Sequence, residues 1–510
     1  MRRLLAVLSG VVLAALSLPA SAAVKLPPLL SDHMVLQREM PVPVWGTATA
    51  GEAVTVKFRD QAKTAAAGPD GRWSLKLDPL KAGGPDTLTV NEVTLTDVLV
   101  GEVWVGSGQS NMEIGVGSFV RGDPVLAQMA DATHPQIRLS HRGGAWLTAE
   151  PKNSGRFSAL LFAFGVRLNK ELNVPVGLMV GAVSGSPAGP WLTDEMLKAD
   201  APSQAVLAKP AEVYKSGEQQ KKYADALAAW ELAAKAAREK KQREPRKPAP
   251  PVAPGECRAG LGRHYASHIQ PMVGYGIRGV LWDQGESGTA IESLDEYHTM
   301  GALIRGWRTA WGQGEFPFIY IQKPSGGGCA WDTANPVTGK AEAFAPLPGK
   351  GPGNDGATVE NFIRIMSYPN TAMAISSDLG SGLHPPNKSG YGHRAADVAL
   401  GMAYGRKIEY YGPIYASHVI EDGKVRLKFT HAGQGLALRN GEKLQGFAVA
   451  GEDKVFQWAD AVIEGDTVVV SSAKVPKPVA VRYAWSGNRT WANLFNKDGL
   501  PAVTFRTDSW

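Results

Sequence analysis

The sequence predicts an α/β fold in which helices cover both faces of a mostly parallel sheet, flanked by two β-rich modules. The 510-residue chain is too long for a single ordinary core. Apolar strands alternate with helical patterns between residues 98 and 406, which is typical of a buried parallel sheet. Short strands of alternating polarity, separated by Gly and Pro turns, occur on both sides of that region.

The N-terminus has the pattern of a secretory signal peptide. Arg2 and Arg3 precede an apolar stretch at 4–18, and small residues at 19–23 provide a cleavage site. The apolar stretch is too short to span a membrane, and no stretch of about 18 apolar residues follows. We therefore expect residues 1–23 to be removed and the protein to be exported to the periplasm, with an extracellular location as the alternative. No membrane partner is expected after cleavage.

Residues 24–97 are predicted to form an N-terminal β-module of the sandwich type. Alternating strands are expected at 42–46, 53–58, 71–77 and 87–90. A second such module is expected at 407–510, with strands at 424–429, 466–470 and 479–485.

The central region, 98–406, is predicted to contain the parallel sheet. Its strands are expected at 98–105, 176–180, 277–282, 318–321 and 371–375, with helices at 159–172 and 294–311. An insertion near 205–256 interrupts this pattern. Residues 219–244, in which Glu is interleaved with Lys and Arg, predict a long exposed helix, and a proline-rich link follows at 245–251.

Charge and cysteine content exclude several partners. The net charge of +6 is small and spread along the chain, so we expect no nucleic-acid partner. Cys257 and Cys329 lack a metal-binding spacing, so no zinc site is expected. Export would permit a disulfide between these two cysteines, but spacing does not decide whether they pair.

The strongest chemical signal is Ser110 in Gly-Gln-Ser-Asn-Met at 108–112, directly after the first strand of the central region. A serine at this turn would lie at the carboxyl edge of the sheet, where open α/β folds place their sites. The backbone N–H of Ser110 can also face a developing oxyanion. Taken singly, the motif is equally compatible with helix capping, a common role of Ser and Asn.

Two further blocks follow strands of the same sheet. In Ser-Gly-Ser-Pro-Ala at 184–188, the backbone N–H of Gly185 is a candidate oxyanion donor, although the block also fits a plain turn. In Trp-Asp-Gln-Gly-Glu-Ser at 282–287, the Gln284 side chain offers a second donor. Glu286 is expected to support the site, as are Gln109 and Asn111 on either side of Ser110.

His384 is the candidate general base. It lies between a predicted strand and a helix that begins near Ser389, and therefore at the same sheet edge. A serine hydroxyl needs such a base, and the imidazole must be held in one tautomer.

These blocks resemble those of sialate O-acetylesterase-type carbohydrate esterases, within the SGNH hydrolase superfamily. Segments at 36–46 and 481–485 resemble the two ends of that family, so the resemblance covers nearly all of the chain after residue 23. It implies an SGNH-like three-layer fold and hydrolysis of O-acetyl esters of sugars, with no cofactor and no metal. Ser110 would be the nucleophile and His384 the base, with oxyanion donors on Ser110, Gly185 and Gln284. The glycan substrate would be an acetylated sialic acid or an acetylated hemicellulose.

One departure leaves the third catalytic residue open. Superfamily members often have Asp three residues before the histidine, where this chain has Ser381. Asp378 is the first candidate for the acid that orients His384, and a backbone carbonyl is the second.

Trp191, Trp282 and Trp331 lie near the blocks and are candidates for stacking on sugar rings, with a core position as the equal alternative. Two other functions compete. A glycosidase could pair Glu286 with Asp283 or Asp378, but Ser110 and His384 would then have no role. A non-catalytic glycan-binding protein would use the two β-modules alone.

Overall fold

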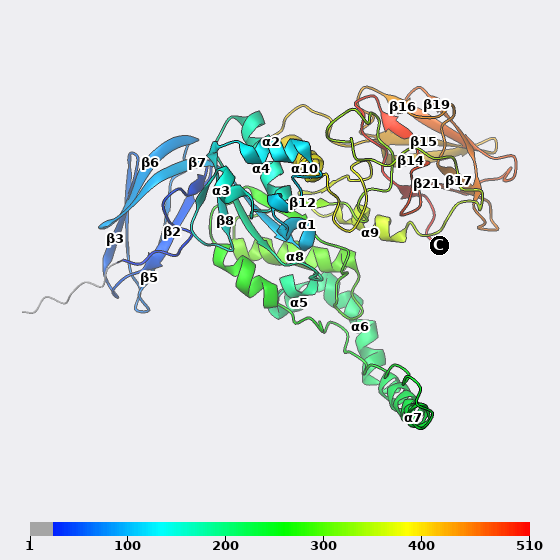
Figure 1. Cartoon of the computed structure of the whole chain (residues 1–510), viewed down its shortest axis with the longest axis horizontal. Coiled ribbons are helices and arrows are strands. Elements are labelled where there is room, and N and C mark those ends of the chain that lie inside the picture. The colour runs from blue at the N-terminus through cyan, green and yellow to red at the C-terminus, as the bar shows by residue number, and fades with distance from the viewer. Residues whose placement is uncertain (1–23) are drawn as a thin grey trace, which may run out of the picture.

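The structure is a computed structural model that describes residues 24–510, so the predicted signal peptide lies outside the described residues. Three regions follow one another along the long axis: an N-terminal group of strands, a central α/β region and a C-terminal group of strands (Figure 1). Across residues 24–510, no helix has the length and apolar character needed to cross a membrane.

The central region is built on a parallel sheet with the strand order β13-β12-β11-β7-β10-β8, extended at one edge by the antiparallel β9. The strands are β7 (Val93–Gly108), β8 (His134–His141), β9 (Leu147–Ala149), β10 (Val176–Ala182), β11 (Gly279–Asp283), β12 (Phe318–Ile321) and β13 (Thr371–Ala374). The α/β prediction is confirmed, and the five predicted strands are present. β8 and β9 were not predicted, because 134–141 mixes polar residues with its apolar ones.

Helices cover both faces of this sheet (Figure 1). α4 and α10 pack on each other and on one face, while α8 and α9 lie on the other with α5 and α6 outside them. The helices are α1 (Ser110–Glu113), α2 (Pro124–Asp131), α3 (Pro151–Ser154), α4 (Ala159–Leu172), α5 (Asp194–Ala199), α6 (Ala201–Lys215), α7 (Glu218–Glu239), α8 (Glu296–Trp311), α9 (Ala357–Ile365) and α10 (Lys388–Met402). The predicted helix at 159–172 is confirmed, and the one at 294–311 begins at Glu296 because Asp295 caps it.

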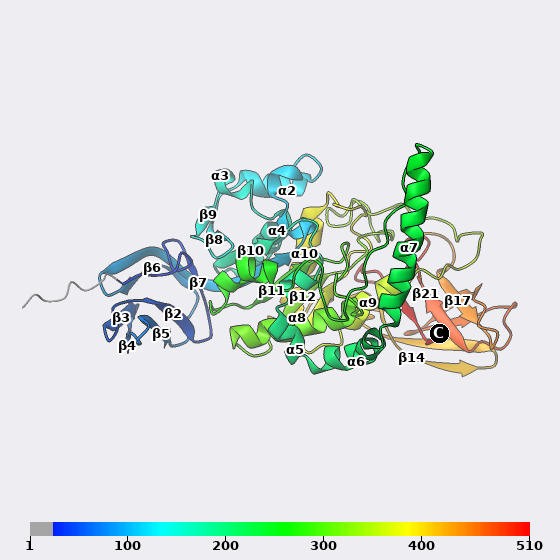
Figure 2. The same cartoon turned by 90° about the horizontal axis from the view of Figure 1, so that it is seen from below.

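The insertion projects away from the body as the long helix α7 (Figure 2). This helix ends at Glu239, before the predicted residue 244, because the chain turns at Lys241 with a positive φ of 51°. The proline-rich segment then returns along α7, where Trp230 donates a hydrogen bond to the Pro245 carbonyl at 2.8 Å.

The N-terminal region is joined to the central sheet through β7. The first part of this 16-residue strand pairs with β6 and β1, and its last part pairs with β10 and β11. The predicted boundary between residues 97 and 98 therefore falls inside one continuous strand. The other strands of the region are β1 (Val35–Gln37), β2 (Val42–Thr47), β3 (Ala53–Phe58), β4 (Gln61–Ala66), β5 (Arg72–Leu77) and β6 (Gly83–Val90).

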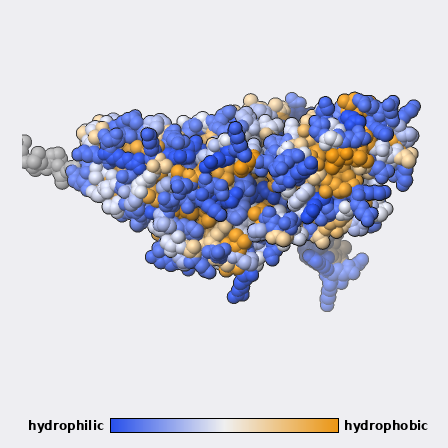
Figure 3. Space-filling view, turned by 90° about the horizontal axis from the view of Figure 1, so that it is seen from above, coloured by the Kyte–Doolittle hydropathy of each residue, from blue (hydrophilic) through white to orange (hydrophobic). Residues whose placement is uncertain are grey.

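The C-terminal region has its own hydrophobic core, centred on residues such as Phe447, Val468 and Tyr483. Two four-stranded sheets, β14-β15-β20-β19 and β18-β17-β21-β23, and the pair β16-β22 surround it. Their strands are β14 (Ile414–Glu421), β15 (Lys424–Thr430), β16 (Leu436–Leu438), β17 (Phe447–Ala450), β18 (Gln457–Trp458), β19 (Asp460–Glu464), β20 (Thr467–Ser471), β21 (Ala480–Tyr483), β22 (Leu494–Asn496) and β23 (Phe505–Arg506). Figure 3 shows a mostly hydrophilic face on which hydrophobic residues gather near the middle and over this end. Both cysteines are free thiols, and burial raises the pKa of Cys329 to about 11.

Candidate active site

Ser110 lies where the longest strand of the sheet ends. β7 finishes at Gly108, and Ser110 is the first residue of α1. Gly108 has a φ of +128°, and a Cβ there would lie 2.1 Å from the Asp283 carbonyl oxygen, so only glycine fits between the two strands. The Gln109 backbone N–H donates to the same carbonyl at 2.8 Å. The turn that presents Ser110 is thus fixed to the end of β11.

His384 lies beside Ser110. Its Nε2 is 2.9 Å from Ser110 Oγ, across the gap between the loop after β13 and the start of α1. Ser110 is buried, whereas His384 and the three residues before it are exposed to solvent. The structure therefore brings together the two residues that the sequence singled out, at hydrogen-bonding distance for proton transfer.

Asp378 does not contact His384, and the prediction that it orients the imidazole is wrong. Its carboxylate binds the guanidinium of Arg394 through both oxygens, at 3.0 and 2.9 Å, and both residues are buried. A buried Arg needs such a partner, so the carboxylate is committed to α10. The predicted alternative is not met either: within residues 24–510, no backbone carbonyl or carboxylate accepts a hydrogen bond from Nδ1 of His384.

The Gly185 loop follows β10 at the same sheet edge. Gly185 is exposed and has a φ of +70°, which favours glycine. The Ser184 backbone N–H donates to the Glu113 carboxylate at 2.6 Å, so the helix that begins with Ser110 also holds this loop. Sequence reasoning missed Glu113, whose signal was its position three residues after Ser110.

Gln284 is fully buried behind the Gly185 loop. Its Nε2 donates to the Gly288 carbonyl at 2.9 Å and lies 3.5 Å from the Ser186 carbonyl oxygen. The first contact holds the side chain in place. The second contact is at the distance limit of a hydrogen bond. The N–H of Gln284 that faces Ser186 is therefore only weakly engaged.

A largely buried polar network starts at Asn111, the residue after Ser110. Asn111 donates from Nδ2 to Glu286 at 3.1 Å, and Lys323 Nζ lies 2.6 Å from both Glu286 and Asp283. On the other side of Asn111, Lys388 Nζ donates to Oδ1 at 2.6 Å. Asn111 and Glu286, which were predicted to support the site, both belong to this network, and Gln109 has its backbone contact to β11.

Burial and neighbouring charges together set the pKa values in this network. Burial lowers the pKa of Lys388 to about 7. It also raises the pKa of Asp283 above its ordinary value, despite the opposing effect of the Lys323 charge. For Lys323, burial acts to lower the pKa, but the carboxylates of Asp283 and Glu286 outweigh it and raise the pKa. Sequence reasoning missed both lysines, although Lys388 closes the block that begins with His384 and Lys323 follows β12 at the same edge.

Two of the three tryptophans predicted to stack on sugar are core residues. Trp191 and Trp282 are at most 1% exposed and pack edge to face on each other, so for these two the core alternative holds and the sugar-stacking alternative does not. Trp331 is half-buried and contacts Phe495 of the C-terminal region and Arg439, whose guanidinium lies over its ring.

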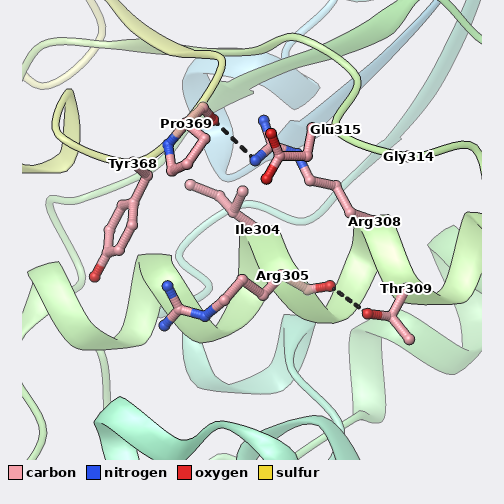
Figure 4. Close-up of a pocket in the computed structure, with 8 residues that line it drawn as sticks. All are labelled: Ile304, Arg305, Arg308, Thr309, Gly314, Glu315, Tyr368 and Pro369. Atoms are coloured by element: carbon pink, nitrogen blue, oxygen red, sulfur yellow. Dashed lines mark hydrogen bonds between the residues drawn. The ribbon is translucent and has the colours of Figure 1, made fainter.

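A cavity of about 430 Å³ lies away from this site (Figure 4). Its lining residues on α8 include Arg305 and Arg308, and the others directly precede β12 and β13. It therefore opens at the amino-terminal edge of the sheet, opposite Ser110. Nowhere in residues 24–510 do three or more His, Cys, Asp or Glu side chains gather as a metal site.

No protein-family model matches this chain. Its relatives include the sialate O-acetylesterases of Rattus norvegicus, 27% identical over 91% of this chain and 89% of that protein, and of Homo sapiens, 24% identical over 91% and 87%. The crystal structure of a carbohydrate acetylesterase from Xanthomonas citri superposes with a TM-score of 0.72 and 29% identity, covering 96% of this chain and all of the other. The chain is a carbohydrate esterase of the sialate O-acetylesterase type.

The esterase is thus a carboxylic ester hydrolase, which removes the glycosidase and the non-catalytic binding protein as interpretations. The carboxylates that a glycosidase would need are bound to cations: Asp283 and Glu286 to Lys323, and Asp378 to Arg394. None of them is arranged as a free pair around an open site.

Proposed function

We propose that the esterase removes acetyl groups from sugar hydroxyls with a Ser110–His384 dyad, through an acetyl-serine intermediate, in an SGNH-type fold. The observation that carries this proposal is the 2.9 Å contact between His384 Nε2 and Ser110 Oγ. A serine hydroxyl becomes nucleophilic when an adjacent base takes its proton.

In the first half of the reaction, Ser110 Oγ attacks the acetyl carbonyl carbon as His384 Nε2 accepts the hydroxyl proton. The tetrahedral intermediate collapses with cleavage of the bond between the carbonyl carbon and the sugar oxygen. His384 returns the proton to that oxygen, and the sugar alcohol leaves. In the second half, His384 takes a proton from water as the water oxygen attacks the carbonyl carbon of the acetyl-serine. The bond between that carbon and Ser110 Oγ then breaks, His384 returns the proton to Oγ, and acetate leaves.

The oxyanion would be bound by the backbone N–H groups of Ser110 and Gly185 and by one N–H of Gln284. Ser110 begins α1, so its N–H has no intrahelical acceptor. The Gly185 N–H is carried on the exposed loop that Glu113 holds, and Gln284 has one N–H engaged only by the 3.5 Å contact. Preorganised donors of this kind stabilise the charge that develops on the carbonyl oxygen.

We propose an O-acetylated sialic acid or an O-acetylated hemicellulose fragment as the substrate. Relatives named sialate O-acetylesterase support the first, and the structural neighbour named carbohydrate acetylesterase supports a sugar ester in general. Export with removal of residues 1–23, to the periplasm or beyond, agrees with a substrate of extracellular origin. Trp331 remains a candidate for sugar contact outside the catalytic residues.

Acetate release from a panel of acetylated sialic acids, acetylated xylan and acetylated xyloglucan fragments tests this proposal. We expect acetate release from one class and none with Ser110→Ala, and we expect no release of the aryl alcohol from an aryl glycoside. Acetate release by a folded Ser110→Ala variant would contradict the serine mechanism, and failure on the whole panel would contradict the substrate class.

A further inference from the structure

The loop that carries His384 is tied down on both sides of an exposed stretch. Tyr391 Oη donates to the Gly380 carbonyl at 2.8 Å, before this stretch. At its end, Asn111 Nδ2 donates to the Leu383 carbonyl at 3.0 Å, one peptide before the imidazole. Residues 381–384 themselves are exposed, so the Asn111 contact is the anchor next to the base.

Asn111 is suited to this task because its amide is fully engaged. It is 1% exposed, and Nδ2 donates to Leu383 and to Glu286 while Oδ1 accepts from Lys388 at 2.6 Å. It directly follows Ser110 in α1. The nucleophile and the backbone of the base are therefore joined through a single side chain.

Lys388 fixes the orientation of the Asn111 amide. It is the first residue of α10, and the next residue, Ser389, donates from its backbone N–H and its hydroxyl to Asp123, both at 2.7 Å. The Lys388 side chain is buried, with Nζ 4.8 Å from the centre of the Phe119 ring. Burial lowers its pKa to about 7, but both the amine and the ammonium carry an N–H that can donate to Asn111.

We propose that Asn111 and Lys388 are positioning residues that set the distance between His384 and Ser110, in the place where related hydrolases use an acid. This inference rests on the proposed serine mechanism. Gly380 and Gly382 in the loop have φ values of +91° and +116°, so the loop has little stiffness of its own once the Leu383 anchor is lost. A displacement of about 1 Å in a reacting group costs roughly a hundredfold in rate.

The test compares Asn111→Asp, Lys388→Met and the double variant in the full-length esterase, with an aryl acetate as substrate. Asn111→Asp keeps the acceptor for Lys388 but cannot donate to Leu383, and Lys388→Met keeps the length of the side chain without its N–H. We expect each to lower kcat by about 10- to 100-fold with KM changed less than about twofold. Because both act through one contact, the double variant should lose little more than the worse single variant.

A second readout separates positioning from general loss of structure. The rate at which a fluorophosphonate labels Ser110 should fall in parallel with kcat, while Tm reports folding. The matched control is Asn493→Asp: this buried asparagine of the C-terminal region donates to the carbonyls of Asn440 and Lys443, both at 2.9 Å. We expect that variant to lower Tm but not kcat or the labelling rate.

The inference is overturned if Lys388→Met and Asn111→Asp keep kcat within about twofold of wild type, or if their losses are additive. Should Asn111→Asp not fold, Lys388→Met alone decides: Lys388 forms no ion pair among the described residues, so this variant leaves only one buried acceptor, Asn111 Oδ1, without its donor. Ser110→Ala distinguishes the two proposals. If it is inactive while both network variants are active, only the positioning role fails; if it is active, the serine mechanism fails first.

Discussion

Asp378, in the loop after β13, and Arg394, on α10, form a buried bidentate ion pair, and within residues 24–510 no carboxylate accepts a hydrogen bond from His384. In the Ser-His-Asp arrangement, a carboxylate holds the imidazole in the correct tautomer. In this protein, the carboxylate of Asp378 binds Arg394 of α10 instead of the imidazole. Substitution of Asp378 should therefore mainly change stability, whereas substitution of Ser110 or His384 should mainly change catalysis.

Asp378→Asn should damage folding far more than chemistry. It leaves the Arg394 charge buried with a weaker partner, and breaking such a pair typically costs about 3–5 kcal/mol of stability. We expect a clearly lower Tm and, in the folded protein at low temperature, a kcat reduced by about tenfold or less. A loss of about ten-thousandfold with unchanged Tm would instead assign Asp378 the role of a triad acid.

Ser110→Ala and His384→Ala should each lower kcat by about a millionfold, and the double variant should be no worse, since nucleophile and base act as a unit. Tm should stay near that of wild type, because neither residue fills the core. Stopped assays with purified enzyme and an aryl acetate measure this. Activity above a few per cent in either variant would rule out the dyad.

Gln284→Ala should lower kcat by about a hundredfold with little change in KM, as expected for one preorganised oxyanion donor. The control is Gln322→Ala: this glutamine is also buried and directly follows a strand of the same sheet, but it accepts from the Ser376 backbone N–H at 3.0 Å. We expect the control to lose stability with a much smaller change in kcat. A change in KM alone for Gln284→Ala would place that residue in substrate binding.

Glu296, in the first turn of α8, should make stability depend on pH. Burial, with contributions from Asp295 and Glu286, raises its pKa from 4.5 to about 8. Between these values the folded protein holds a proton that the unfolded chain has released, so wild-type stability falls as pH rises from about 4.5 to about 8. Glu296→Gln removes this loss. Its Tm should be close to that of wild type near pH 4.5 and higher by several degrees above pH 8.

The surface residue Glu218 provides the comparison for that experiment. It is exposed on α7 and pairs with Lys222 at 2.6 Å, and solvent screens such surface pairs so that they contribute little to stability. Glu218→Gln should therefore shift Tm by a small and nearly constant amount across the same pH range. An equal shift for Glu296→Gln at pH 4.5 and pH 9 would contradict the raised pKa.

The order of strands and helices was predictable because apolar runs at 176–180, 318–321 and 371–375 are long enough to show their burial. The bounds of α4 followed from the helical pattern at 159–172, and in the structure Ser158 caps its start. β8 was not predictable, since it begins with polar residues such as His134 and Gln136, and only the part from Ile137 to His141 pairs with β10. Tertiary pairing of this kind leaves no local signal.

Within the site, Ser110 and His384 were predictable because each occupies a turn after a strand, and parallel strands bring such turns to one edge. The pairing of Asp378 with Arg394 was not predictable. Arg394 lies within α10, and the direction in which that helix faces depends on how it packs. The same reason applies to Trp191 and Trp282: a tryptophan near a motif has no sequence feature that separates the core from a sugar-binding surface.

β7 connects the N-terminal region directly to the turn that presents Ser110. Its first residues belong to the N-terminal region and its last residue is two positions before Ser110, with every residue from Val98 to Gly108 buried. Side chains alternate along a strand, so inserting one residue in this stretch would reverse its phase and turn the nucleophile away from His384. Removing or replacing the N-terminal region should therefore disturb the position of Ser110. That region anchors the distal end of the strand whose phase aims the reactive hydroxyl.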